Sequence, residues 1–482
     1  MPRGRLIASV LLPFAAGYFL SYVFRTVNAV IATDLAAELN LNAADLGLLT
    51  STYFLVFAAV QLPLGVLLDR VGPTLVQSVL MLVTGVGALV FALADGFVGL
   101  MVGRALLGLG VSVALMAGVK AISVWFPSDR SSLATGWLVM LGALGALTAT
   151  APADLVVQAV GWRGLFVALA GLSGLTSLLV LFAAPEPATT KAAVLPMATF
   201  STIYRSAHFW RVAPLSAFGV GTSWSLQGLW AAPWLRDVNG FERSMIVDHL
   251  SGMAIAVCVG ALLFGAGADR LRTAGLKAEN LLAATLTLSV LGQTALILNW
   301  PLPPLLPFAI IAAAGAATVL SFAVIRAHFP KAIAGRANGA LNLLHVGAAF
   351  AVQSATGFLI AQWPDSQGSY PVEAHRTAMA IILAPQLASF VWFALAFRVR
   401  KLWMKPSAPL VSRAYNTRLL PSTRFGPVTG DRWRVAAIAS ICICVALATV
   451  LASTVGVSQA DLFSAGVTWA AARADTHLRL LP

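Results

Sequence analysis

The feature that most constrains this sequence is a succession of apolar stretches of about 20 residues, the length that a helix needs to cross a bilayer. Hydrophobic residues make up 59% of the 482 residues and charged residues only 10%, whereas soluble domains carry about 25% charged residues. The mean hydropathy is +0.86. This composition excludes an ordinary soluble domain and predicts an all-α membrane protein that crosses the bilayer many times.

Short polar joints, often holding Pro, Gly or Asp-Arg, divide the chain into thirteen predicted membrane helices. We expect them at residues 6–31, 44–68, 74–94, 97–124, 132–158, 163–183, 212–235, 248–268, 279–299, 304–327, 336–362, 376–398 and 434–457. The first begins with a basic and then an apolar region, as a cleaved signal peptide does. Its apolar run continues for a full membrane thickness, so we expect an uncleaved helix.

The cysteines do not indicate a cofactor. Cys258, Cys442 and Cys444 all lie inside predicted helices. No His or second cysteine pair stands at metal-ligand spacing, so the sequence predicts neither a disulfide framework nor a zinc site. We expect no enzymatic activity, because no nucleophile, base and orienting group stand out together.

The formal net charge of +13 is explained by where the basic residues lie. With the N-terminus in the cytoplasm, most Lys and Arg fall in cytoplasmic segments, which is the positive-inside bias of membrane proteins. The charge therefore indicates contact with an anionic cytoplasmic leaflet, and not with nucleic acid. We expect an integral protein of the bacterial cytoplasmic (inner) membrane, with its C-terminus outside.

An internal repeat divides the chain up to residue 398. The segment "GVLLDRVG" at 65–72 recurs 200 residues later as "GAGADRLR", and "WFPSDRSSLATG" at 125–136 recurs 203 residues later as "HFPKAIAGRANG". An even number of predicted helices separates the copies, so both halves have the same orientation in the membrane. The expected domains are a six-helix half at 1–183, a cytoplasmic linker at 184–211 and a second six-helix half at 212–398.

At these residues the chain resembles the major facilitator superfamily. The best-known loop motif of that family, G-x-x-x-D-R-x-G, is matched by Gly65, Asp69, Arg70 and Gly72. Pro73 and Thr74 replace the basic residues that usually close it. Two further patterns agree with the family, R-x-x-x-G-x-G at Arg104, Gly108 and Gly110, and "GWRGLF" at 161–166. The resemblance implies a twelve-helix bundle for secondary transport, to which a thirteenth helix is added.

The two Asp-Arg loops are candidate gates. In a pseudo-symmetric bundle, Asp69 would face the start of the eleventh predicted helix near Gly335, where a carboxylate stabilises the positive helix terminus by about 0.3–1 kcal/mol. Asp269 would do the same near Ser131. The alternative is that Asp-Arg only solvates a tight turn and fixes topology. The gating candidates are Gly65, Asp69, Arg70, Gly72, Asp269 and Arg270.

Arg25 is the most informative polar residue, because a central Arg in a membrane helix costs about 2.5–3.5 kcal/mol. It shares one helix face with Tyr22 and Asn28 at spacings of three. Such a charge usually faces the bundle interior and marks a pathway, although it can instead bond to carbonyls of a neighbouring helix. Other candidate substrate ligands lie in other predicted helices: Tyr53, Gln61, Gln227, Asn342 and His345. For His345, a hydrogen-bonded core histidine is the alternative.

Of the further cations within predicted helices, Arg104 and Lys120 are candidates for a role in transport. The resemblance implies that Arg104 is a packing and proton-coupling element. Lys120 lies near the cytoplasmic end of the same predicted helix, where its long side chain can also snorkel to the surface. Both are therefore candidates for coupling or for structural roles.

The central parts of the twelve predicted helices hold no Asp or Glu, and the nearest acids are Asp95 and Asp154 toward the external side. Arg25 therefore needs a counter-ion, which an anionic substrate would supply to the bidentate donors of the guanidinium. The sequence predicts a transporter for a small organic or inorganic anion that works by alternating access, with anion exchange favoured. The alternatives are a carrier of neutral or hydrophobic compounds and a transporter-like accessory subunit of a membrane complex.

The chain continues past the twelfth predicted helix. Residues 399–433 are basic, a composition suited to an anionic leaflet. The extra helix at 434–457 carries small residues at every fourth position from Ala436 to Gly456, so another helix can approach it closely. That face either packs on the chain's own bundle or, together with the external tail at 458–482, docks a protein partner.

Overall fold

The computed structural model describes residues 3–185, 198–273, 277–364 and 369–403. The chain divides into two compact units, Met1–Phe393 and Ala394–Pro482. The second unit is described only up to Trp403, as the end of a helix that begins in the first unit. The predicted basic segment at 399–433, the thirteenth helix and the tail therefore lie almost entirely outside the described residues.

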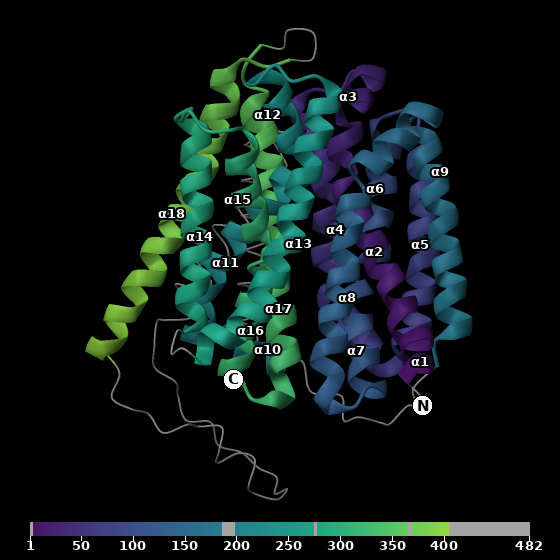
Figure 1. Cartoon of the computed structure of the whole chain (residues 1–482), viewed down its shortest axis with the longest axis vertical. Coiled ribbons are helices and arrows are strands. Elements are labelled where there is room, and N and C mark those ends of the chain that lie inside the picture. Colours follow the sequence, from purple (N-terminus) through teal and green to yellow (C-terminus); the bar gives the residue numbers. More distant parts are fainter. Residues whose placement is uncertain (1–2, 186–197, 274–276, 365–368, 404–482) are drawn as a thin grey trace, which may run out of the picture. The chain divides into compact units, whose positions relative to one another are not determined.

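All regular elements in the described part are helices (Figure 1). The first half contains α1 (Arg3–Leu6), the π-helical turn η1 (Ile7–Leu11), α2 (Leu12–Thr26), α3 (Asn28–Leu39), α4 (Ala43–Val71), α5 (Pro73–Ala92), α6 (Phe97–Val111), α7 (Ala114–Trp125), α8 (Ser128–Thr148) and α9 (Ala151–Ala183). The second half contains α10 (Ala198–Tyr204), α11 (Ala207–Ser225), the π-helical turn η2 (Leu226–Trp230), α12 (Ala231–Asp237), α13 (Arg243–Thr273), α14 (Ala278–Ile297), α15 (Leu305–Gly315), α16 (Thr318–His328), α17 (Lys331–Ile360) and α18 (Val372–Trp403).

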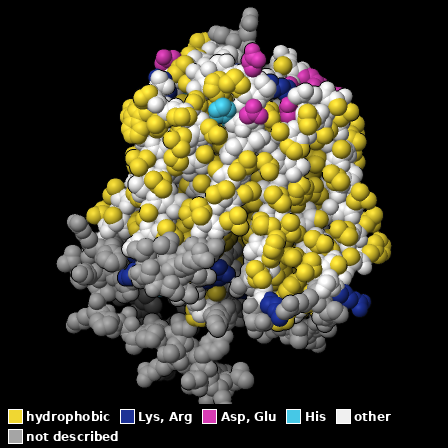
Figure 2. All heavy atoms as spheres, in the orientation of Figure 1, with side chains coloured by type: hydrophobic (Ala, Val, Ile, Leu, Met, Phe, Trp, Pro, Cys, Tyr) yellow, Lys and Arg dark blue, Asp and Glu magenta, His cyan; other side chains and the backbone are white. Residues whose placement is uncertain are grey.

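Ten helices of the described part are long and apolar enough to cross a membrane. The fifth and seventh predicted spans are not among them. The fifth is divided between α8 and the start of α9, and the seventh is built from α11, η2 and α12. Hydrophobic side chains cover the middle of the face shown in Figure 2, whereas its acidic side chains gather at the top of the view. The chain is therefore an integral membrane protein.

Local sequence explains several boundaries. Asn40 ends α3 in the left-handed conformation (φ 51°), and Asn42 begins α4 with a capping box in which Asp45 is the partner. The first predicted helix therefore extends beyond residue 31, and a break at Val27 divides it. Gly161 (φ 73°) makes the turn inside α9, where the sequence predicted a joint between two helices.

Helix breaks recur at the spacing of the sequence repeat. The break at Val27 in the first half and η2 at Leu226–Trp230 in the second lie about 200 residues apart. The gap at 112–113, between α6 and α7, has its counterpart at 316–317, between α15 and α16. Of these irregular turns η2 is π-helical, and π-helical turns are frequent at functional sites.

The glycines of the R-x-x-x-G-x-G pattern allow close helix packing. A Cβ at Gly108 would clash with the carbonyl oxygen of Tyr53 on α4. A Cβ at Gly110 would lie 2.6 Å from the carbonyl oxygen of Leu80 on α5. These two positions bring α6 against both neighbouring helices, and this contact places Arg104 inside the bundle.

The hydrophobic core differs between the two ends of the bundle. We call the end that carries the C-terminus of α3 and α12 the upper end, and the end where α1 begins the lower end (Figure 1). At the upper end one cluster joins both halves, with Ala29 and Leu46 packed with Leu229 and Trp230. Two clusters lie toward the lower end. One is made of first-half residues that include Phe14 and Leu138, and the other of second-half residues that include Phe209 and Leu341.

Candidate functional site

Arg25 lies near the end of α2, two residues before the break at Val27. Its guanidinium carbon is 3.9 Å from the ring centroid of Tyr22 and 4.6 Å from that of Trp224. Tyr22 belongs to the same helix, whereas Trp224 belongs to α11 of the second half. Arg25 is thus at the interface between the halves, and cation–π contacts of this kind stabilise a charge by about 0.5–2 kcal/mol.

No acidic side chain among the described residues pairs with Arg25, and the groups that interact with it electrostatically are the hydroxyls of Tyr18, Tyr22 and Tyr53. The surroundings therefore solvate the cation without neutralising it. A guanidinium in such a site retains donors for an anion, and it can bind a carboxylate or sulfonate with two hydrogen bonds.

Trp224 connects Arg25 to the polar groups of the second half. Its ring is stacked on Phe54 at 6.5 Å and lies edge-on to His345 at 6.2 Å. His345 is fully buried, and its Nε2 lies 2.7 Å from the hydroxyl of Ser216. Among the described residues, His345 Nδ1 has no hydrogen-bond partner. Asn342 is half-buried one turn earlier on α17.

Three of the predicted ligands are bonded to their own half. The Asn28 amide donates to Thr50 Oγ1 at 2.9 Å. The Tyr53 hydroxyl donates to the carbonyl of Ser21 at 3.3 Å. The Gln61 amide donates to the carbonyl of Ser112 at 3.3 Å, at the break between α6 and α7. These contacts give Asn28 and Gln61 roles in packing that the helical spacing did not indicate.

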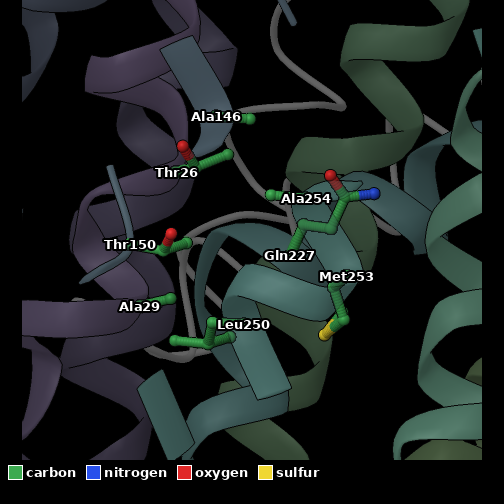
Figure 3. A pocket seen from close by; sticks show the side chains of 8 residues that line it. All are labelled: Thr26, Ala29, Ala146, Thr150, Gln227, Leu250, Met253 and Ala254. Carbon is green, nitrogen blue, oxygen red and sulfur yellow. The ribbon is translucent and has the colours of Figure 1, made fainter. Parts of the chain in front are cut away.

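A narrow cavity lies next to Arg25 on the side of the upper end. Its lining combines Thr26, Ala29, Ala146 and Thr150 of the first half with Gln227, Leu250, Met253 and Ala254 of the second. Figure 3 shows Thr26 and Thr150 on one side of this cavity and Gln227 and Met253 on the other. The Gln227 amide donates to Ser223 Oγ at 2.9 Å. Of the predicted ligands, Gln227 is the one that lines this cavity.

Arg104 is buried, and it holds the helix that carries Arg25. Its Nη1 donates to the carbonyl of Phe24 at 3.1 Å, and the guanidinium lies over the rings of Phe91 and Phe166. Arg104 Nε and Nη2 have no hydrogen-bond partner among the described residues. The contact with Phe24, the residue before Arg25, favours the packing role over the coupling role.

The gating candidates lie at the lower end. Lys120 Nζ is 2.7 Å from the Asp69 carboxylate and also donates to the carbonyl of Leu68 at 2.6 Å. Both side chains are partly exposed, so Lys120 reaches the surface as a snorkelling residue does. Arg70 is exposed, and a Cβ placed on Gly65 or Gly335 would meet no atom within 4 Å.

Of the remaining gating candidates, Gly72 (φ 101°) occupies the turn between α4 and α5, in a conformation that favours glycine. The side chains of Asp269 and Arg270 lie outside the described part of the chain, so their predicted gating role stays a prediction.

Polar contacts that were not predicted from the sequence join the two halves at the upper end. Arg243, at the start of α13, donates to Asp154 at 2.8 Å through Nε and to Asp34 at 2.9 Å through Nη1. On the other side of the bundle, the backbone N–H of Ala43 donates to the Tyr370 hydroxyl at 3.1 Å. The repeat contains a signal for this arrangement, because positions 43 and 243 are separated by its offset of 200 residues.

Two hydroxyl pairs follow the same symmetry. Ser251 Oγ donates to Thr150 Oγ1 at 3.0 Å, between α13 and the joint that precedes α9. Ser354 Oγ donates to Ser51 Oγ at 2.7 Å, between α17 and α4. Ser51 and Ser251 are 200 residues apart. The repeat therefore extends to the contacts between the halves.

The described residues contain no group of three or more His, Cys, Asp or Glu side chains that could hold a metal ion. The sequence model of the Major Facilitator Superfamily matches residues 14–276. The chain belongs to the major facilitator superfamily. A solved superfamily structure, a bacterial homologue of the human lysosomal transporter Spinster in an inward-facing and unoccupied conformation, has a similar fold. Its TM-score is 0.69 at 18% identity, with 84% of this chain and 100% of that chain covered.

Two curated superfamily members show similarity in sequence. One is a probable sulfoacetate transporter from Cupriavidus necator, 26% identical over 54% of this chain and 65% of its own length. The other is the hexuronate transporter of Escherichia coli K12, 26% identical over 48% of this chain and 57% of its own length. The matched region thus spans less than two thirds of either relative.

Proposed function

We propose that this superfamily member is a secondary transporter that moves a small anionic solute by alternating access, with Arg25 as the main ligand of the anion. The observation that carries the proposal is a cation at the interface of the halves with no acidic partner among the described residues. A central Arg costs roughly 2.5–3.5 kcal/mol in a membrane helix. An anion that binds it compensates this cost during each transport cycle.

The similar proteins support an anionic cargo. Sulfoacetate carries a sulfonate and a carboxylate, and a hexuronate carries a carboxylate, so both offer oxygen pairs that a guanidinium binds. Tyr22, Gln227, Asn342 and His345 would then contact the remainder of the solute. Asn28, Tyr53 and Gln61 would support the site through their hydrogen bonds within the first half.

The proposed fold is a twelve-helix bundle of two halves, with α8 and the broken helix α11–η2–α12 counted as spans and a thirteenth helix at 434–457. We assign the lower end to the cytoplasmic side of a bacterial inner membrane, because the Asp69–Arg70 loop and Lys120 lie there. The upper end, closed by Arg243 and the hydroxyl pairs, then faces outside. Separate hydrophobic clusters toward the lower end favour a state that is open to the cytoplasm.

Asp69 and Lys120 act in this proposal at the cytoplasmic gate. Their ion pair lies within the first half, which leaves the start of α17 free to move away. When the lower end closes, Asp69 would exchange Lys120 for the N-terminus of that helix. The basic residues of 399–433 would bind the anionic leaflet, and residues 434–482 would pack on the bundle or dock a protein partner.

The aromatic groups around Arg25 favour a second candidate, a carrier of neutral or hydrophobic compounds. Tyr18, Tyr22 and Tyr53 supply ring faces that an uncharged solute can contact. Arg25 would then be a structural residue held by cation–π contacts. The two candidates differ in whether the solute must carry a negative charge.

Uptake by purified protein in liposomes tests the proposal. Labelled sulfoacetate, a hexuronate and nitrate serve as anions, and the neutral hexose of matching size serves as the control. We expect saturable uptake of at least one anion and none of the hexose. Uptake of the hexose alone would favour the neutral-substrate carrier, and the absence of any transport would favour an accessory subunit.

A further inference from the structure

We propose that Trp224 allows the substrate-free carrier to change conformation, so that removing its ring converts net transport into obligatory exchange. This inference rests on the proposed function, because it assigns a role to Trp224 in the cycle of an anion carrier. The step in question is the return of the empty carrier, in which no anion takes part.

Trp224 belongs to the second half and contacts the charged guanidinium of Arg25, which belongs to the first half. Its ring centroid is 4.6 Å from the Arg25 guanidinium carbon. The Tyr22 ring is 3.9 Å away but lies on the same helix as Arg25 and accompanies it in any movement. A ring on α11 therefore provides the contact through which the second half stabilises the charge of the first.

The electrostatics give this contact a role when no anion is bound. A carrier that closes around a monoanion such as a hexuronate encloses a neutral pair, and a dianion such as sulfoacetate still supplies one group that pairs with Arg25. A carrier that closes without an anion encloses an unpaired charge, which is strongly unfavourable in a dry interior. Cation–π attraction strengthens when water is excluded. The Trp224 ring thus lowers the barrier of the substrate-free transition and contributes little to the loaded one.

The surroundings of Trp224 keep its ring in place. It stacks on Phe54 of the first half at 6.5 Å and lies edge-on to His345 of its own half at 6.2 Å. Trp224 itself is half-buried. The ring is therefore positioned by packing from both halves, and its approach to Arg25 does not depend on a flexible loop.

The test compares two fluxes through the same protein. Purified wild type and Trp224→Leu are placed in liposomes at a clamped membrane potential, with labelled sulfoacetate and a labelled hexuronate as probes. Net uptake is measured in empty vesicles, and exchange is measured in vesicles preloaded with the unlabelled probe. We expect Trp224→Leu to lower net uptake about tenfold, which corresponds to about 1.4 kcal/mol in the barrier, and to leave exchange within about twofold of wild type.

Two controls separate the ring from the bulk of the side chain. Trp224→Phe restores an aromatic face and should retain most of the net uptake. Trp137→Leu removes an exposed tryptophan of α8 and should change neither flux. If Trp224→Leu does not insert, fluorinated tryptophans at position 224 weaken the attraction of the ring without changing its shape, and net uptake should fall stepwise with fluorination while exchange is retained.

Equal losses of net uptake and exchange in Trp224→Leu would overturn the inference, as would equal behaviour of the Leu and Phe variants or no response to fluorination. Failure of the wild-type protein to move either probe in both assays is a different outcome. It would reject the proposed function, and the role of Trp224 with it.

Discussion

Around Arg25, the residues that share its helix were easier to predict than those that reach it from elsewhere. The spacing predicts that Tyr22, Arg25 and Asn28 share one polar face, because helix periodicity is a local property. In the structure Tyr22 lies against Arg25, whereas Asn28 follows the break at Val27. Trp224 was not identified, since its contact with Arg25 depends on how two halves of the chain dock. Asn28 was identified by polarity, but it donates to Thr50, and polarity alone does not distinguish a bonded amide from a free one.

A buried carboxylate orders the upper end of the second half. Asp237 accepts hydrogen bonds from Arg236 Nε at 2.6 Å, from Ser369 Oγ at 2.9 Å and from the backbone N–H of Tyr370 at 3.2 Å, and its Oδ2 lies 2.8 Å from His375 Nε2. Burial would raise the pKa of the Asp237 carboxyl, but hydrogen bonds from His375 and Arg236, and their charges, lower it to about 2 from an ordinary value of 3.8. A lowered pKa means that the ionised group stabilises the fold.

Asp237→Asn is expected to lower the stability at pH 7 by roughly 1–2 kcal/mol. Because the folded-state pKa is the lower one, this stabilisation is complete above about pH 4 and disappears as the pH falls toward 2. Thermal unfolding in detergent at pH 7, 4 and 2.5 checks the prediction, with exposed Asp248→Asn as a control of equal charge change. An Asp237→Asn protein that loses as much stability as wild type between pH 4 and 2.5 would contradict it.

At the scale of helices, apolar length and polar joints were sufficient to predict most of the spans. The interruptions at Val27, at η2 and at Ala316 were not predicted, because such turns depend on packing between helices and leave a weak local signal. The seventh predicted helix continues through η2 to Asp237. Asp154 was predicted only to be one of the two acids nearest to the core, and its partner Arg243 could not be found without knowing how the halves dock.

Asp154→Asn is expected to weaken the closed upper end. Asp154 is buried, and it forms an ion pair with Arg243 across the halves. Removing the charge of Asp154 leaves Asp34 as the carboxylate that pairs with Arg243. The population should shift toward a state that is open at the upper end. A cysteine at Ala29 or Ala254, in the cavity lining, should then react several-fold faster with an impermeant reagent from that side.

Asp95→Asn is the matched control for this charge change, because the Asp95 side chain is 99% exposed and lies 3.9 Å from Arg163 within its own half. In the Asp95→Asn protein, the introduced cysteine should react at the rate measured without the substitution. If the introduced cysteine reacts no faster in the Asp154→Asn protein than in the Asp95→Asn protein, then the Arg243 contacts do not hold the upper end closed.

At the scale of the whole molecule, the two halves share one hydrophobic core at the upper end and have separate cores toward the lower end. This arrangement is compatible with a movement in which each half rotates as a rigid body about their interface. The repeat was visible in the sequence because its loops keep Asp-Arg and Phe-Pro at nearly constant offsets. The conformational state was not predictable, since the sequence of the proposed transporter must satisfy both states of an alternating-access cycle.

Truncation after Met404 is expected to leave transport measurable. Both halves end before that point, and the Arg25 site and the contacts across the halves lie between Tyr18 and Tyr370. The measurement is initial uptake rate per inserted molecule, which we expect to stay within about fivefold of the full chain. Complete loss of activity from a well-inserted truncated protein would show that residues 405–482 belong to the mechanism.

The central claim is that a transported anion binds Arg25, and the most direct test is the concentration dependence of anion uptake in wild type, Arg25→Lys and Arg25→Ala. A hydrogen bond to a charged group contributes about 1.5–3 kcal/mol, so we predict that Arg25→Ala lowers the apparent affinity by about 10-fold to 100-fold or abolishes uptake, with insertion unchanged. Arg25→Lys keeps the charge without the paired donors and should also fail. Near-native affinity for the same anion in Arg25→Ala would contradict the account.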